Sequence, residues 1–259
     1  MKFFKKGHCR KIVRKFTLVK PPLSVPQAQL TKALRFKEFI SENERRQLLT
    51  ILQNCNFPSY TSNVNEDIDT LGNPVHTTMY VQTDNFFETK LDWLHKRIVK
   101  LVRHLNIKER WGFNMSSDSS FNVRVAEYHE MSEGGSLSDC RHVDVGSVVT
   151  VDIMLEEATK GAIFQTLEST KKTVDELKHI HHTGHEKSEE INKEKEFLKP
   201  HSFCARDAMV FMSHKYHCVS TLLKGQRKVF VVEFWNGQKP ICGHRCEDPT
   251  GNCTFIPEE

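Results

Sequence analysis

Long hydrophobic runs are absent from this sequence of 259 residues. No stretch approaches the roughly 18 consecutive apolar residues of a membrane-spanning helix, so no transmembrane segment is predicted. The N-terminus also lacks the apolar core of about 7–15 residues that a secretory signal needs. A cytoplasmic location is therefore the expectation, and the cysteines are expected to be reduced.

Acidic residues are missing from the first 37 positions. This stretch has 11 Lys and Arg, and the first carboxylate is that of Glu38. The rest of the chain carries 26 Lys and Arg against 33 Asp and Glu, so a basic N-terminal arm precedes an acidic body. Like a mitochondrial presequence, the arm contains no acidic residues, which leaves a mitochondrial location open. Unlike such a presequence, the arm is not Ser-rich. A contact with acidic lipid or nucleic acid and a solvated tail are the other two interpretations.

Strong compositional bias is missing too, because hydrophobic residues make up 38% of the chain and charged residues 27%. This balance excludes disorder throughout and allows a sizeable core. The length suits one large domain with extensions. We expect the basic arm at residues 1–33, a main domain at residues 34–240 and a cysteine-rich tail at residues 241–259.

The main domain begins with helical patterns. Ser41 and Glu44 have the spacing of a capping box at the start of a helix predicted over residues 41–54. A second helix is predicted over residues 85–105, where apolar residues recur at steps of three and four. Short apolar runs then predict strands over residues 75–83, 121–129, 146–155, 161–167, 207–212 and 228–235. This order predicts an α+β domain whose catalytic half is a jelly roll flanked by N-terminal helices.

A charged insertion at residues 168–199 interrupts the predicted strands. It contains four histidines, which are His179, His181, His182 and His185. Histidine clusters can bind metal, but no predicted strand holds these side chains rigidly. An exposed lid or a partner loop is therefore the favoured interpretation.

The tail holds three cysteines, Cys242, Cys246 and Cys253, with His244 among them. Their spacing matches no common zinc motif, so a local disulfide, a zinc site and free thiols all stay open. Because the tail follows the last predicted strand, we expect these cysteines to be structural and to lie outside the active site.

The string Arg141-His142-Val143-Asp144 is the most informative part of the sequence. On an extended segment, His142 and Asp144 point to the same face and can chelate one metal ion. His217 is the candidate third ligand, and His214 competes with it. Two histidines and one carboxylate form the facial triad of non-haem Fe(II) oxygenases. The alternative is an ordinary hydrogen-bonded pair between His142 and Asp144.

Arg227 follows His217 by ten residues, at the start of the last predicted strand. A guanidinium inside a sheet sandwich costs free energy unless it meets an anion, and Arg suits bidentate binding of a carboxylate. The distal carboxylate of 2-oxoglutarate would be such an anion. A salt bridge to a protein carboxylate is the other interpretation.

Taken together, His142-x-Asp144, His217 and Gly225-x-Arg227 resemble the motifs of the 2-oxoglutarate- and Fe(II)-dependent dioxygenases, most closely the prolyl-4-hydroxylase-like branch. The resemblance covers roughly residues 35–240. It implies a double-stranded β-helix core, Fe(II) on the three ligands, and 2-oxoglutarate and O₂ as cosubstrates, and it leaves ascorbate open as a further cofactor. Tyr128 resembles the tyrosine that helps the arginine to hold 2-oxoglutarate.

The resemblance also implies the reaction, which is hydroxylation of a C–H bond with release of succinate and CO₂. A peptidyl prolyl residue is the first expectation for the substrate, a lysyl residue the second, and small molecules stay open. Nucleic acid is disfavoured, because Glu233 stands where the related demethylases carry a second Arg. A non-catalytic binding module on the same scaffold is the alternative function. His129 is expected to point away from Tyr128 and to be structural.

Overall fold

The computed structural model describes residues 23–57, 59–61, 75–115, 121–168, 198–240, 242–248 and 250. The arm before residue 23, the histidines of the charged insertion and Cys253 lie outside the described residues. The helices are α1 (Val25–Gln29), α2 (Glu42–Asn54), α3 (Phe86–Lys90) and α4 (Asp92–Lys108), with a 3₁₀ turn, η1, at Thr83–Asn85. Within the described ranges, no helix is long and apolar enough to cross a membrane.

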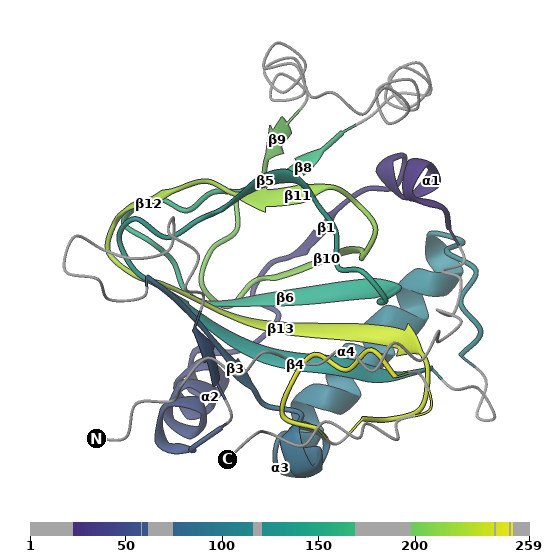
Figure 1. The fold of residues 1–259 in the computed structure, drawn as a ribbon, viewed down its shortest axis with the longest axis horizontal. Coiled ribbons are helices and arrows are strands. Elements are labelled where there is room, and N and C mark those ends of the chain that lie inside the picture. Colours follow the sequence, from purple (N-terminus) through teal and green to yellow (C-terminus); the bar gives the residue numbers. More distant parts are fainter. Residues whose placement is uncertain are drawn as a thin grey trace, which may run out of the picture.

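Two antiparallel sheets form the body of the protein. The large sheet has the order β1 (Leu34–Phe36), β10 (Ala208–Met212), β6 (Val149–Glu156), β13 (Arg227–Asn236), β4 (Phe121–Met131), β3 (His76–Tyr80) and β2 (Ser59–Thr61). The small sheet has the order β5 (Leu137–His142), β11 (His217–Val219), β8 (Phe164–Leu167) and β9 (Leu198–Pro200), and β12 (Leu222–Lys224) pairs with β7 (Lys160–Gly161). Figure 1 shows the small sheet above one face of the large sheet. This is a double-stranded β-helix with helices beside it, as predicted.

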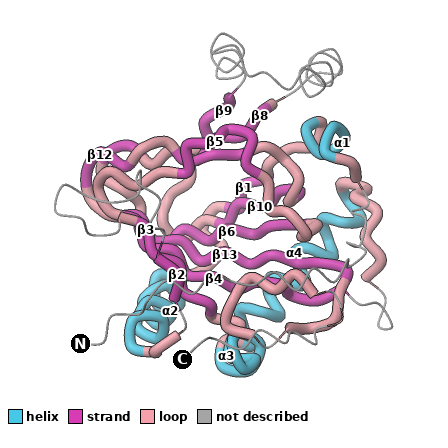
Figure 2. Tube along the Cα trace, viewed as in Figure 1, coloured by secondary structure: helices cyan, strands magenta, loops and turns pink. Residues whose placement is uncertain are grey.

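Helix α2 begins at the predicted capping box. The Ser41 hydroxyl accepts from the Glu44 amide at 3.3 Å, and the Glu44 carboxylate accepts from the Ser41 amide at 2.7 Å. Leu48 and Leu52 are fully buried on the inner side of the helix. Figure 2 shows α2, α3 and α4 gathered on one side of the large sheet.

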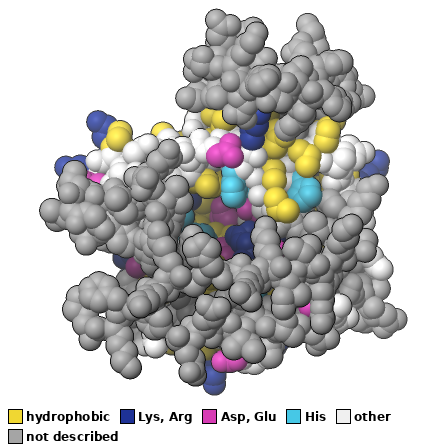
Figure 3. Space-filling model, viewed as in Figure 1, with side chains coloured by type: hydrophobic (Ala, Val, Ile, Leu, Met, Phe, Trp, Pro, Cys, Tyr) yellow, Lys and Arg dark blue, Asp and Glu magenta, His cyan; other side chains and the backbone are white. Residues whose placement is uncertain are grey.

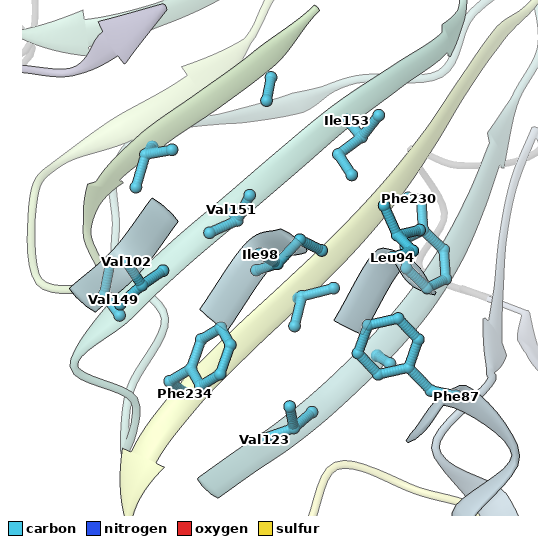
Figure 4. Packing of buried hydrophobic residues seen from close by; sticks show 14 of the residues in the cluster. Phe87, Leu94, Ile98, Val102, Val123, Val149, Val151, Ile153, Phe230 and Phe234 are labelled. Carbon is cyan, nitrogen blue, oxygen red and sulfur yellow. The ribbon is translucent and has the colours of Figure 1, made fainter. Parts of the chain in front are cut away.

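The second predicted helix is interrupted at Leu91, where φ is −114° and ψ is 32°, so α3 and α4 are separate. Helix α4 then packs the apolar row Leu94, Ile98 and Val102 on the large sheet, as Figure 4 shows. Burial of each such side chain stabilises the fold by about 1.5–3 kcal/mol. The opposing side chains come from β4, β6 and β13, and they include Val123, Val149, Val151, Ile153, Phe230 and Phe234.

Strand β13 presents a different face to each layer. Phe230, Val232 and Phe234 belong to the core under the helices. Val229 and Val231 pack instead with side chains from the small sheet and β10. We call this second side of the large sheet the inner face. Arg227 and Glu233 share it by the period-two alternation of a strand.

Among the described residues, no disulfide joins Cys242 to Cys246. Neither cysteine belongs to a group of three potential metal ligands within the described part of the chain.

Candidate metal centre

Three predicted ligands come together between the two sheets. His142 ends β5 and His217 begins β11, and the two residues are cross-strand partners. Their rings meet edge to face, with centroids 4.9 Å apart at an angle of 87°. The Asp144 Oδ1 atom lies 3.3 Å from His142 Nε2 and 3.7 Å from His217 Nε2. One ligand atom from each residue fits within 4.8 Å, a spacing at which one metal ion can bind all three.

Hydrogen bonds fix the carboxylate of Asp144. Its Oδ2 atom accepts from Thr150 Oγ1 at 2.6 Å, and its backbone amide donates to the Ser213 carbonyl at 2.8 Å. The Thr150 and Ser213 hydroxyls lie 2.9 Å apart. Oδ1 therefore stays oriented toward the two imidazoles, as outer partners do for metal ligands.

The imidazole of His217 is also oriented. Its Nδ1 atom lies 2.9 Å from the Lys215 carbonyl, to which it can only donate. That assignment leaves the Nε2 lone pair for a metal. The rings of Phe211 and Phe164 pack against the imidazole at centroid distances of 4.8 and 5.9 Å.

The electrostatics suit a cation. Burial alone would raise the pKa of Asp144, but the neighbouring His217 and His142 hold it below its usual range. Burial lowers the pKa of His217, so its imidazole is neutral at neutral pH. Ligands must be deprotonated to bind metal, and this set of two imidazoles and one carboxylate fits Fe(II). The side chain of His142 is 36% exposed, so one side of the centre is accessible.

His214, the competing third ligand, is not in this group. It lies in the loop between β10 and β11, and burial lowers its pKa. Both ring nitrogens are buried without a hydrogen-bond partner. The loop therefore brings His217 to the other two ligands and leaves His214 outside the group.

Arg227 begins β13 on the inner face and is only 6% exposed. Its Nε atom has no hydrogen-bond partner, and no carboxylate of the described residues forms an ion pair with the guanidinium. Burial and the nearby Asp144 raise the pKa of Asp152 to about 8, so Asp152 is largely uncharged at neutral pH and does not neutralise the arginine. The buried cation is available for an anion.

Tyr128 lies on the face of β4 that is turned toward the helices. It pairs with Phe230, and both side chains lie in the core under the helices, on the opposite face of the sheet from Arg227. Its hydroxyl donates to Glu130 Oε1 at 2.6 Å. The Tyr128 side chain therefore lies on the face of the sheet away from Arg227, whereas the role implied by the resemblance would place it beside an anion bound there.

The neighbours of Tyr128 in β4 occupy the inner face instead. His129 Nε2 lies 3.0 Å from Glu127 Oε2, and His129 Nδ1 lies 3.0 Å from His76 Nε2. His129 does point away from Tyr128, as expected, but that direction brings it to the side of Arg227. The strand register determines which face of the sheet His129 occupies. In the sequence, only the alternation of residues 121–129 indicated that face.

The tail comes close to the candidate metal centre through Arg245, while the expectation that its cysteines lie outside the active site stays a prediction. After β13 the chain turns back across β4 (Figure 1), and Arg245 reaches two carboxylates of the inner face, Glu127 and Glu233. Figure 3 shows a hollow in this side of the molecule where acidic, basic and histidine side chains gather. The sequence did not indicate Arg245, since no local pattern shows that the chain turns back over β4 after β13.

No family model matches the sequence, and no curated protein matches it. Solved structures match its fold. They include the non-heme alpha ketoglutarate dependent epimerase SnoN from nogalamycin biosynthesis, with 13% identity, 91% of each chain covered and a TM-score of 0.54. HygX from Streptomyces hygroscopicus, with nickel and 2-oxoglutarate bound, has 11% identity, covers 86% of this chain and 91% of its own, and has a TM-score of 0.50.

A prolyl-4-hydroxylase from Pseudomonas putida matches with 11% identity, 82% of this chain and 96% of its own covered, and a TM-score of 0.50. At such identities the likeness establishes the fold, which is that of the 2-oxoglutarate and Fe(II) oxygenases. The chemistry of this chain must be argued from its own residues.

Proposed function

We propose that this protein is an Fe(II)- and 2-oxoglutarate-dependent dioxygenase that hydroxylates a C–H bond and releases succinate and CO₂. One observation carries the proposal. The His142, Asp144 and His217 ligand set lies together, and the rings of Phe164 and Phe211 that pack on His217 also pack with the face of β13 that carries the buried Arg227, whose Nε atom has no partner. A non-catalytic scaffold has no need of this combination.

His142, Asp144 and His217 would hold the iron, and three coordination positions would stay open for cosubstrates. The bound iron would supply the activation of O₂ against 2-oxoglutarate. The protein would position 2-oxoglutarate at the iron. Arg227 would bind the distal carboxylate through its planar fork, and Phe164 and Phe211 would keep water from the ligand side.

The substrate we propose first is a peptidyl prolyl residue, followed by a lysyl residue, with small molecules as the other class. The likeness to the Pseudomonas putida prolyl-4-hydroxylase supports the first. The likeness to SnoN, which is described as an epimerase from nogalamycin biosynthesis, supports small molecules as the other substrate class.

The test is 2-oxoglutarate turnover by protein purified without oxygen, loaded with Fe(II) and then exposed to air. We expect succinate to form, and His217→Ala to abolish both its formation and metal binding. His104→Ala, an exposed histidine on α4, is the matched control and should retain both. Unchanged turnover in His217→Ala would refute the ligand assignment, and absence of succinate from the wild type would refute the function.

A further inference from the structure

The C-terminal segment at residues 242–248 is docked on the body of the protein by its backbone. Gln82 Nε2 donates to the carbonyls of Cys242 and His244 at 3.3 and 3.0 Å. Arg124 Nε donates to the carbonyl of Cys246 at 2.8 Å, and Cys246 is fully buried. The position of the segment is therefore set on both sides of residue 245.

Arg245 extends from this segment to two buried carboxylates. Its NH2 group lies 2.9 Å from Glu127 Oε2, where it donates a hydrogen bond. The same group lies 2.7 Å from Glu233 Oε1, close enough for an ion pair although the angle does not suit a hydrogen bond. Glu127 and Glu233 are 1% and 0% exposed, whereas the Arg245 side chain is 34% exposed. The guanidinium thus lies between the two acids and the accessible space.

This ion pair is adjacent to the metal centre. Glu233 is the cross-strand partner of Thr150, and directly opposed side chains in a sheet lie roughly 4.5–5.5 Å apart at Cβ. Thr150 donates to Asp144, and Ser147 donates to the other oxygen of Glu233 at 2.5 Å. Glu233 and Thr150 therefore connect Arg245 to Asp144, one of the proposed metal ligands.

The charges on the inner face explain what Arg245 can do there. Arg124 NH1 lies 3.6 Å from Glu233 and gives that acid a second cation. Glu127 has Arg245 and the His129 imidazole as its partners. Although burial would raise the pKa of Glu127, Arg245 and His129 outweigh it and hold the pKa below its usual range. Without Arg245, the inner face would present an added negative charge where charges are weakly screened.

We propose that Arg245 is a positioning residue of the active site, which neutralises Glu127 and Glu233 beside the metal ligands and so lets a dianion enter. The inference rests on the proposed function, because 2-oxoglutarate is that dianion. It makes the C-terminal segment a required part of the cosubstrate site. Arg227 provides the direct contact, and Arg245 removes the repulsion.

The experiment compares the binding of a cation and an anion in Arg245→Gln, with Mn(II) in place of Fe(II) to prevent turnover. Calorimetry should show 2-oxoglutarate binding to the Mn(II) form weakened at least tenfold, while Mn(II) binding stays equal or becomes tighter. Damage to the fold would weaken both. Arg245→Lys should retain most of the affinity for 2-oxoglutarate. Arg206→Gln is the matched control, since the Arg206 side chain is 32% exposed and pairs with Glu38, which belongs neither to the ligand group nor to the partners of Arg245.

Removal of the opposing charge provides a rescue. Arg245→Gln combined with Glu127→Gln should bind 2-oxoglutarate within about threefold of the wild type, and it carries the test should Arg245→Gln alone not fold. Wild-type 2-oxoglutarate affinity in Arg245→Gln, equal losses for Mn(II) and 2-oxoglutarate, or a double variant as weak as the single one would each overturn the proposal. A wild-type protein that binds Mn(II) but not 2-oxoglutarate would instead refute the proposed function.

Discussion

The buried ammonium of Lys215 donates to the backbone carbonyl of Gln29 at 3.0 Å and thereby joins the loop that leads to His217 to helix α1. The side chain of Gln29 completes the connection. It donates to the carbonyl of His214 at 2.8 Å and accepts from the amide of Tyr216 at 2.8 Å. A short helix near the N-terminus thus fixes the backbone on both sides of Lys215.

Gln29→Ala should therefore lower both stability and metal affinity. Two buried backbone groups would lose their partner, at a cost of about 1–3 kcal/mol each. We expect the free energy of unfolding in urea to fall by about 2–6 kcal/mol and Mn(II) to bind more weakly. Gln47→Ala, on the exposed side of α2, is the control and should change neither. Wild-type stability in Gln29→Ala would contradict this role of α1.

Thr150→Val should weaken metal binding without loss of a ligand. The hydroxyl of Thr150 holds Asp144 at 2.6 Å, and loss of such an outer partner usually costs about 10–100-fold in metal affinity. Competition with a metal-sensitive dye measures the change. Thr50→Val, on the exposed side of α2, should have no effect. Equal affinities in the two variants would show that Asp144 is held well enough by its backbone.

Arg227→Ala should lower 2-oxoglutarate affinity selectively. A charge-assisted bond contributes about 1.5–3 kcal/mol, and about 1.4 kcal/mol corresponds to a tenfold change. We therefore expect at least a tenfold rise in the dissociation constant with Mn(II) bound, and a smaller rise in Arg227→Lys, which keeps the charge but not the planar fork.

The control for Arg227 is Lys228→Ala, the next residue of β13, whose ammonium pairs with Glu156 at 2.8 Å. It should bind 2-oxoglutarate as the wild type does. If folded Arg227→Ala has wild-type affinity, the main reason for 2-oxoglutarate as cosubstrate disappears.

Tyr128→Phe should leave 2-oxoglutarate affinity unchanged within about twofold, because the hydroxyl lies on the side of the sheet away from Arg227. It should lower the free energy of unfolding by about 1 kcal/mol through loss of the bond to Glu130. Calorimetric titration and urea unfolding of one preparation measure both. A tenfold loss of affinity would restore the role that the resemblance implied.

Asp152→Asn should stabilise the metal-free protein more at pH 8 than at pH 5. Burial raises the pKa of Asp152 to about 8, whereas in the unfolded chain it is roughly 4. The folded state therefore binds the proton more tightly, and the cost of this acid to stability grows as pH rises from about 4 to about 8. Urea unfolding at the two pH values measures the difference. Equal stabilisation by Asp152→Asn at the two pH values would contradict this prediction.

Local patterns in the sequence predicted the elements well, because the capping box of α2 and the apolar row of α4 depend on neighbours in the chain. The ligands were also predictable, since a short spacing puts His142 and Asp144 together. The break at Leu91 was not, because the apolar period continues through it.

The errors concern residues whose place depends on distant pairing. The face that Tyr128 occupies follows from its register with Phe230. The place of Arg245 follows from the return of the chain over β4, far along the sequence from Glu127. Neither relation leaves a local pattern, so the sequence alone predicted that His142, Asp144 and His217 come together and missed the charges around them.

The pairing of His142 with His217 has a mechanical consequence. These residues lie on the facing edges of β5 and β11, and their register shifts directly after the histidine pair. A metal ion bound by both histidines would link two strands that are distant in the chain. Its binding free energy would add to the free energy of unfolding. Metal binding would then slow amide hydrogen exchange in the small sheet more than in the rest of the protein. The metal ion would therefore stabilise the jelly roll in addition to taking part in the reaction.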